Sequence, residues 1–203
     1  MWAQESVFYQ IYTLGFCGAP IFNEEHSEEQ TALHRIRKVE DWIPHLKKLG
    51  INAVYFCPIF SSDSHGYDTR DYFKLDERLG TNDDFRDVCR ALHDNGIRVV
   101  LDGVFNHCGS FNKWLDRELI YENQPGYEKG AYVDKDSPYH SFFKFNNEHA
   151  WPYNEFYDGW WGHATLPKLN YEESGELFDY ILRIGKKWAS PPYNIDGWRL
   201  DVA

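Results

Sequence analysis

Two charged residues near the C-terminal end of the sequence could act together in catalysis. Arg199 and Asp201 lie two positions apart in the segment Gly-Trp-Arg-Leu-Asp. If this segment is a strand, both side chains point to the same face, because alternate residues of a strand share a face. An arginine beside an aspartate keeps that carboxyl group ionised and oriented. An ionised carboxylate held under an acetal carbon can serve as the nucleophile of a retaining glycosidase.

Further polar residues follow two other apolar segments. They are His65, Tyr67 and Asp68 after one segment, in the sequence His-Gly-Tyr-Asp, and Asp102, Asn106 and His107 at the end of the other. A single aspartate at a strand end is more often a cap or an ion-pair partner, and a single histidine is more often a satisfied core residue. Because three segments end in the same way, we expect these residues to share one site.

The segments that carry these residues are predicted to be parallel strands buried on both faces. These strands are expected at residues 51–56, 97–101 and 195–200, and a further candidate strand at the start of the chain covers residues 7–12. Helical patterns lie between them, at about residues 39–49, 85–92 and 177–188. Gly50 and Gly96 suit the C-terminal ends of the first two helices, and Thr81 with Asp84 resembles a capping box.

This order of elements predicts an α/β fold with a parallel sheet, and both a (β/α)8 TIM barrel and a doubly wound sheet satisfy it. About 46 residues separate the second strand from the third, but about 98 separate the third from the fourth. In a barrel, the added residues would extend from the C-terminal end of the third strand, which is on the face that carries active sites. We therefore predict the first part of a barrel in residues 1–107, an inserted domain B in residues 108–170, and the third barrel helix and fourth strand in residues 171–203.

Composition limits the class of partner. The formal net charge of -11 argues against binding to nucleic acid, which needs a basic surface. No apolar run is long enough to span a bilayer, so no membrane partner is expected. The four cysteines, which form no Cys-x-x-Cys pair, suit a reducing compartment and predict a cytoplasmic protein, unless a leader was removed. Aromatic residues make up 18% of the chain, and some of these rings could bind sugars.

Four motifs together resemble the alpha-amylase family. Asp102-Gly-Val-Phe-Asn-His107 resembles its first signature and Gly197-Trp-Arg-Leu-Asp201 its second, while Leu166-Pro-Lys-Leu-Asn170 is similar to the short signature of domain B. With His65-Gly-Tyr-Asp68, they occur in the family's order over the whole chain. Each motif alone is weak evidence, but four in register are specific.

The resemblance implies a role for each site residue. Asp201 would be the nucleophile and Arg199 its partner, and Asp102 would be a structural carboxylate beneath the site. Tyr67 would stack on the glucose before the scissile bond, and that sugar would also be bound by the neighbouring residues His65, Asp68 and His107. Asn106 would ligate a structural calcium in members that have one. Many cytoplasmic members lack this calcium, so we expect no required cofactor.

The resemblance also implies a substrate class. The forms Pro-Lys-Leu-Asn and Gly-Trp-Arg-Leu-Asp-Val-Ala are similar to the cyclomaltodextrinase, neopullulanase and maltogenic amylase group, which favours maltodextrins, cyclodextrins or related α-glucans. Many members of that group carry an N-terminal β-sandwich that helps them to dimerise, whereas the first barrel strand here begins almost at once.

The family's acid/base glutamate and its third carboxylate, an aspartate, would follow Asp201, but the sequence ends two residues after it. Glu172, Glu173 and Glu176 are predicted at the start of a helix, where carboxylates serve the helix dipole. We therefore expect the chain alone to be inactive and to need the C-terminal half of the barrel as a partner.

Two alternatives remain open. One is a catalytically silent α-glucan-binding protein derived from this family. The other is a doubly wound α/β protein with a different ligand, although no glycine-rich phosphate loop follows any predicted strand.

Overall fold

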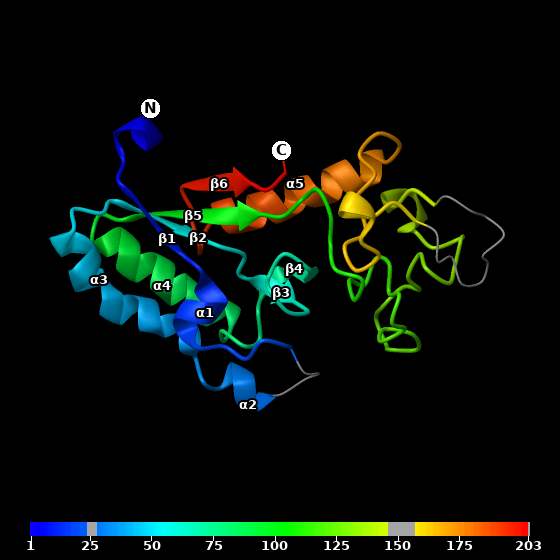
Figure 1. Cartoon of the computed structure of the whole chain (residues 1–203), viewed down its shortest axis with the longest axis horizontal. Helices are drawn as coiled ribbons and strands as arrows, with labels where there is room; N and C mark the ends of the chain where they lie inside the picture. The colour runs from blue at the N-terminus through cyan, green and yellow to red at the C-terminus, as the bar shows by residue number, and fades with distance from the viewer. Residues whose placement is uncertain (24–27, 146–156, 203) are drawn as a thin grey trace.

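A four-stranded parallel sheet forms the centre of the computed structural model, which describes residues 1–23, 28–145 and 157–202 (Figure 1). Its strands are β1 (Phe8–Ile11), β2 (Ala53–Phe56), β5 (Arg98–Gly103) and β6 (Gly197–Leu200). They lie side by side in the order in which they follow one another along the chain, and all three pairings are parallel. The order does not reverse, as it does at the switch point of a doubly wound sheet. The sheet is therefore the first four strands of a (β/α)8 barrel, as predicted.

Three amphipathic helices connect these strands and cover the outer face of the sheet. They are α3 (Lys38–Lys48), α4 (Asn82–Asp94) and α5 (Gly175–Ala189). Alternate strand residues such as Val54, Phe56, Val99 and Leu101 join the apolar core that the helices complete. The intervening strand residues point to the other face, which is the interior of a barrel.

The predicted helix ends are confirmed. Thr81 Oγ1 accepts a hydrogen bond from the Asp84 amide at 3.1 Å, and the Asp84 carboxylate accepts from the Thr81 amide at 2.8 Å, which completes a capping box. Gly50 and Gly96 each follow a helix with φ of +73°, a left-handed conformation that glycine adopts without strain.

An antiparallel pair of strands after β2 was not predicted from the sequence. It consists of β3 (Phe60–Ser62) and β4 (Thr69–Leu75), and its register shifts twice. The shifts break the alternation of buried and exposed residues that identifies a strand in a sequence. The residues between these two strands include the whole of the His65–Asp68 segment, so the pair positions that segment.

The remaining elements are single turns of helix. They are η1 (Trp2–Glu5), α1 (Thr13–Cys17), α2 (Glu28–Thr31), η2 (Arg35–Arg37), η3 (His140–Phe142) and η5 (Trp160–Gly162).

The chain between β5 and α5 lies beyond the carboxyl ends of β5 and β6, as the lobe on the right of Figure 1 shows. His107 pairs with Lys168, and Gly159 pairs with Pro167, in isolated antiparallel bridges that tie the lobe to the end of β5. Residues 146–156 of the predicted domain B lie outside the described residues. The boundaries at residues 107 and 170 stay a prediction.

The described residues contain no helix that is long and apolar enough to cross a membrane. The cysteines, which are Cys17, Cys57, Cys89 and Cys108, are all buried free thiols.

Candidate active site

Asp102 is the centre of a hydrogen-bond network on the inner face of the sheet. Its side chain is fully buried, and its Oδ2 atom accepts hydrogen bonds from the hydroxyl groups of Tyr55 and, at 3.2 Å, Tyr67. Its Oδ1 atom accepts from Arg199 Nη1 at 3.1 Å. The register explains this convergence, because Asp102 lies opposite Arg199, and Tyr55 lies opposite Val100, two residues before Asp102 on the same face.

Burial and charge act against each other at Asp102. Burial raises the pKa of this carboxyl group above its ordinary value, while the hydrogen bonds from Tyr55, Arg199 and Tyr67 lower the pKa. Burial and the nearby carboxylate together raise the pKa values of Tyr55 and Tyr67. Both phenols are therefore protonated at neutral pH and are hydrogen-bond donors.

Arg199 joins Asp102 to Asp201. The same Nη1 atom that donates to Asp102 lies 2.5 Å from Asp201 Oδ1. Burial alone would lower the pKa of Arg199, but the hydrogen bonds to Asp201 and Asp102 raise it, so the guanidinium stays charged. The Asp201 amide donates to the Gly103 carbonyl at 3.1 Å, which holds the residue against the end of β5.

Asp201 is largely enclosed, because only 14% of its side chain is exposed. It is one of the residues that line a cavity of about 400 Å³, together with Leu200 and with Phe178 and Leu182 of α5, the helix that covers the outer face of the sheet. The network therefore contains one carboxylate whose two oxygens both accept hydrogen bonds, Asp102, and one whose Oδ1 atom accepts from Arg199, Asp201. A carboxylate that an arginine orients can act as a nucleophile.

Asp68 and His65 differ in their exposure to solvent. Asp68 is buried, and its carboxylate accepts from Ser64 Oγ at 2.6 Å and from the Gly66 amide at 3.2 Å, so it shapes the turn. The side chain of His65 is 53% exposed and can be reached by a ligand. His65 and Asp68 line another cavity, of about 440 Å³.

His107 is in contact with the backbone of Tyr67. Its side chain is buried, and its Nε2 atom lies 3.1 Å from the Tyr67 carbonyl oxygen. Its Nδ1 atom lies 3.2 Å from Nδ2 of the Asn106 side chain. These contacts suit the neutral ring with the proton on Nε2, and burial lowers the pKa of His107 accordingly. Both ring nitrogens have protein partners in this arrangement, and the direct sugar contact that the resemblance implied stays a prediction.

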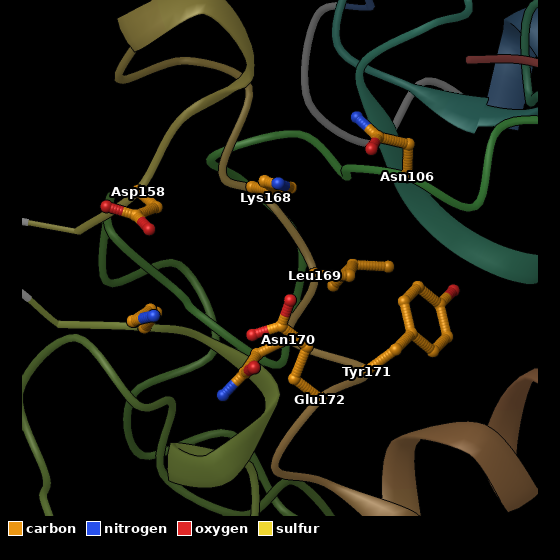
Figure 2. Close-up of a pocket in the computed structure, with 8 residues that line it drawn as sticks. Asn106, Asp158, Lys168, Leu169, Asn170, Tyr171 and Glu172 are labelled. Carbon is orange, nitrogen blue, oxygen red and sulfur yellow. The ribbon is translucent and has the colours of Figure 1, made fainter. Parts of the chain in front are cut away.

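The surroundings of Asn106 do not suit calcium. Asn106 lines a cavity of about 260 Å³ that also contains Lys144, Lys168, Asp158 and Glu172. Figure 2 shows Lys168 between Asp158 and Asn106. Ammonium groups repel a cation, whereas calcium needs six to eight oxygen ligands. Over residues 1–23, 28–145 and 157–202, no group of three or more histidines, cysteines, aspartates or glutamates is placed to hold a metal ion.

Two of the glutamates near α5 lie elsewhere than predicted. Glu176 is in the first turn of the helix, as expected, but Glu172 and Glu173 precede its N-cap residue, Ser174. Glu172 lines the cavity at Asn106, and Glu173 accepts a hydrogen bond from the Asn170 side chain at 3.2 Å. The Ser174 side chain caps the helix instead, by accepting from the Leu177 amide at 3.2 Å.

Sequence reasoning did not find Tyr55. The sequence did contain a signal for this residue, because its hydroxyl is the only polar side-chain group in β2. A polar group at an inward position of a buried strand needs a hydrogen-bond partner. Of the predicted residues, the structure joins Tyr67, Asp102, Arg199 and Asp201 in one network, with His107 supporting it from behind.

Comparison with known proteins identifies the family of the chain. Residues 29–203 match the family described as the alpha amylase catalytic domain. An amylopullulanase of Thermoanaerobacterium saccharolyticum is 36% identical over 187 residues, which cover 82% of this chain and 14% of that protein. A cyclomaltodextrinase of Thermoanaerobacter pseudethanolicus is 34% identical over 220 residues, which cover 100% of this chain and 35% of that protein.

Solved structures agree with the sequence matches. The ligand-free cyclic α-maltosyl-(1→6)-maltose hydrolase of Arthrobacter globiformis superposes with a TM-score of 0.75 at 29% identity, over 99% of this chain and 45% of that one. The debranching enzyme of Nostoc punctiforme gives a TM-score of 0.71 at 33% identity, over 99% of this chain and 42% of that one. The chain thus spans less than half the length of these relatives. Together with the partial barrel and the network around Asp102, these matches show that the chain belongs to the alpha-amylase family.

Proposed function

We propose that this chain supplies the nucleophile side of the active site of a retaining α-glucan hydrolase. The observation that carries the proposal is the position of Asp201, which Arg199 holds at the carboxyl end of β6, next to the network around Asp102. The bonds cleaved would be α-1,4 glucosidic bonds, with α-1,6 bonds as a second linkage. The substrates would be maltodextrins, cyclodextrins or related α-glucans.

The chemistry takes place in two steps. Asp201 attacks the anomeric carbon and forms a covalent glycosyl ester, while a carboxylic acid protonates the departing glycosidic oxygen. The same carboxyl group, as a base, then removes a proton from water, which attacks the ester and releases the sugar and Asp201. Arg199 orients Asp201 for the attack by donating a hydrogen bond to it.

The second carboxyl group must lie about 5 to 5.5 Å from the nucleophile. Asp102 is the carboxylate joined to Asp201 through Arg199, but both of its oxygens are occupied by donors from Tyr55, Tyr67 and Arg199. It is therefore a structural carboxylate and not the acid. We propose that the acid comes from the second half of a barrel, which the 203 residues do not include.

The proposed substrate contacts come from the loop between β3 and β4. Tyr67 would place its ring against the glucosyl unit that Asp201 attacks, and His65 would bind its hydroxyl groups. His107 would bind the same sugar, and it also holds the Tyr67 carbonyl. The names of several relatives support the substrate class, among them the cyclomaltodextrinase, a maltogenic α-amylase of Bacillus acidopullulyticus and neopullulanase 2 of Thermoactinomyces vulgaris. An intracellular maltogenic amylase of Bacillus subtilis supports an intracellular site of action.

The test is reconstitution. The purified chain is assayed on maltoheptaose and β-cyclodextrin, alone and after co-expression with the C-terminal barrel half of the cyclomaltodextrinase relative. We expect turnover only in the reconstituted protein, and we expect Asp201→Asn to reduce it at least about 10³-fold because the nucleophile is lost. Asp179→Asn, which changes an exposed carboxylate of α5, is the matched control and should leave turnover unchanged.

Two results would overturn this proposal. Full turnover in the reconstituted Asp201→Asn variant would show that another residue is the nucleophile. Turnover by the chain alone, abolished by Asp201→Asn, would show that the acid lies within the 203 residues.

A second candidate function is that of a non-catalytic α-glucan-binding protein. The observation that favours it is the enclosure of Asp102, which leaves Asp201 without a second available carboxyl group in the network. In that case the chain would bind maltoheptaose, but reconstitution would produce no hydrolysis, so Asp201→Asn would have none to remove. Calorimetric titration of the chain with maltoheptaose, beside the turnover assay, distinguishes the two functions.

A further inference from the structure

Trp161 is displayed at the surface in a conformation that tryptophan rarely adopts. It lies in the η5 turn, and 86% of its surface is exposed. Its backbone has φ of +53° and ψ of +25°, the left-handed region that favours glycine and asparagine. An exposed ring adds little packing energy, so packing does not explain a tryptophan at this position.

The turn that carries Trp161 is firmly built. Gly159 pairs with Pro167, and the amides of Gly162 and His163 donate to the carbonyls of Gly159 and Trp160, both at 3.0 Å. A Cβ atom on Gly159 would lie only 2.2 Å from the His163 carbonyl oxygen, so the turn closes tightly on itself. Strained residues persist where the surrounding structure fixes them, and they concentrate at functional sites.

The turn is joined directly to the candidate active site. Lys168 pairs with His107, and the Cys108 amide donates to the Pro167 carbonyl at 3.0 Å. The ring of Trp160 stacks on His107, with centroids 5.4 Å apart and planes at 25°, and the ring of Trp161 lies 5.9 Å from that of Trp160. Two successive ring contacts therefore lead from the residue behind Tyr67 to the exposed indole.

We propose that Trp161 is a stacking platform for a glucosyl unit of an α-glucan, at a position outside the one at Asp201. This inference rests on the proposed function. The apolar face of a glucose ring matches an exposed indole, which supplies a large, rigid contact surface without a hydrogen bond that would need exact alignment. Because Trp161 is separated from His107 by the ring of Trp160, the platform serves longer substrates and is not reached by short ones.

The test compares three variants in the chain reconstituted with the C-terminal half. Trp161→Asn removes the ring and suits the left-handed backbone, so it should fold normally. Trp161→Tyr retains a ring. Tyr127→Ala is the matched control, because it removes another partly exposed aromatic ring of the lobe, one that packs against Tyr121.

The predicted effect depends on substrate length. Trp161→Asn should raise KM for maltoheptaose about 3- to 10-fold with kcat nearly unchanged, since uniform binding energy is lost. KM for maltotriose should change less than twofold. Trp161→Tyr should restore most of the affinity for maltoheptaose, and Tyr127→Ala should have no effect. Calorimetric binding of maltoheptaose to the Asp201→Asn form should show the same order of affinities.

The outcomes separate the two proposals. If the wild-type protein hydrolyses maltoheptaose and Trp161→Asn has the same KM, the platform is wrong and the proposed function stands. An equal loss in Trp161→Asn and Tyr127→Ala, or an equal loss for maltotriose and maltoheptaose, also overturns the platform, because the effect is then not one of local stacking. If the reconstituted wild type neither binds nor hydrolyses any α-glucan, the proposed function fails and the platform fails with it.

Discussion

Replacing Tyr55 by phenylalanine tests the network around Asp102 directly. The change removes one hydroxyl group and leaves the ring, so the packing of β2 is preserved. In the wild type this hydroxyl donates to Asp102 Oδ2, an atom of a fully buried side chain. After the change, that oxygen keeps only the hydrogen bond from Tyr67, at 3.2 Å. The variant thus leaves a buried carboxylate with one donor fewer.

The size of the effect follows from this geometry. A hydrogen bond to a charged group contributes about 1.5 to 3 kcal/mol. The remaining Tyr67 donor places the loss at the lower end, at about 1 to 2 kcal/mol. For a protein of this length, a loss of that size lowers Tm by about 3 to 6 °C.

The effect should also depend on pH. Burial raises the pKa of Asp102 in the folded protein, so folding is most favoured where this group is protonated, and that contribution is lost as the pH rises through the folded pKa. Tyr55→Phe removes a hydrogen bond that stabilises the ionised form and raises the folded pKa further. The difference in stability between wild type and variant should therefore grow as the pH rises from 4 to 8.

The assay is thermal and urea unfolding, followed by circular dichroism, in a double-mutant cycle with Asp102→Asn. We expect a coupling free energy of about 1 kcal/mol between Tyr55 and Asp102. Tyr67→Phe is the matched control and should cost less, because its hydrogen bond is the longer one. A Tyr55→Phe variant as stable as the wild type, or a coupling below about 0.3 kcal/mol, would refute this account of the network.

Three further variants test other parts of the structure. Arg78→Met should lower the free energy of unfolding by about 3 to 5 kcal/mol, because it leaves the buried Asp76 carboxylate unpaired; urea unfolding measures this, and a loss below about 1 kcal/mol would contradict it. Thr81→Ala should cost about 1 kcal/mol because the helix cap is lost. Hydrogen exchange should then be faster in the first turn of α4, and Asn95→Ala, at the other end of the helix, should leave the exchange of that turn unchanged. Burial lowers the pKa of His107, so its contribution to stability is present above its ordinary pKa of about 6.5 and is lost as the pH falls below that value. His107→Gln should therefore have a flatter profile of Tm between pH 5 and 7, and a profile as steep as that of the wild type would show that another group is responsible.

The strand and helix segments could be predicted because their signals are local. The apolar runs that became β2, β5 and β6, and the helical patterns of α3, α4 and α5, depend on side chains a few residues apart. The capping box of Thr81 and the glycines after α3 and α4 depend on backbone geometry within one turn. These features are set by the chain itself, before any distant contact forms.

The sequence also determined which residues could do chemistry. The spacing of Arg199 and Asp201 places them on one face of a strand in any fold that keeps the strand, and the structure shows them in contact. The four family motifs identified the other polar residues, and the matches to known proteins confirm the family.

Only the tertiary structure decided what those residues contact. The β3–β4 pair was missed because two register shifts break its alternation, and the enclosure of Asp102 by donors from β2, β6 and the loop after β3 depends on how three distant segments align. The contacts of His107 with the Tyr67 carbonyl and with the ring of Trp160 depend in the same way on the packing of distant segments. A strand fixes the face to which a side chain points, but its hydrogen-bond partners come from residues 40 to 100 positions away, and sequence spacing does not encode those distances.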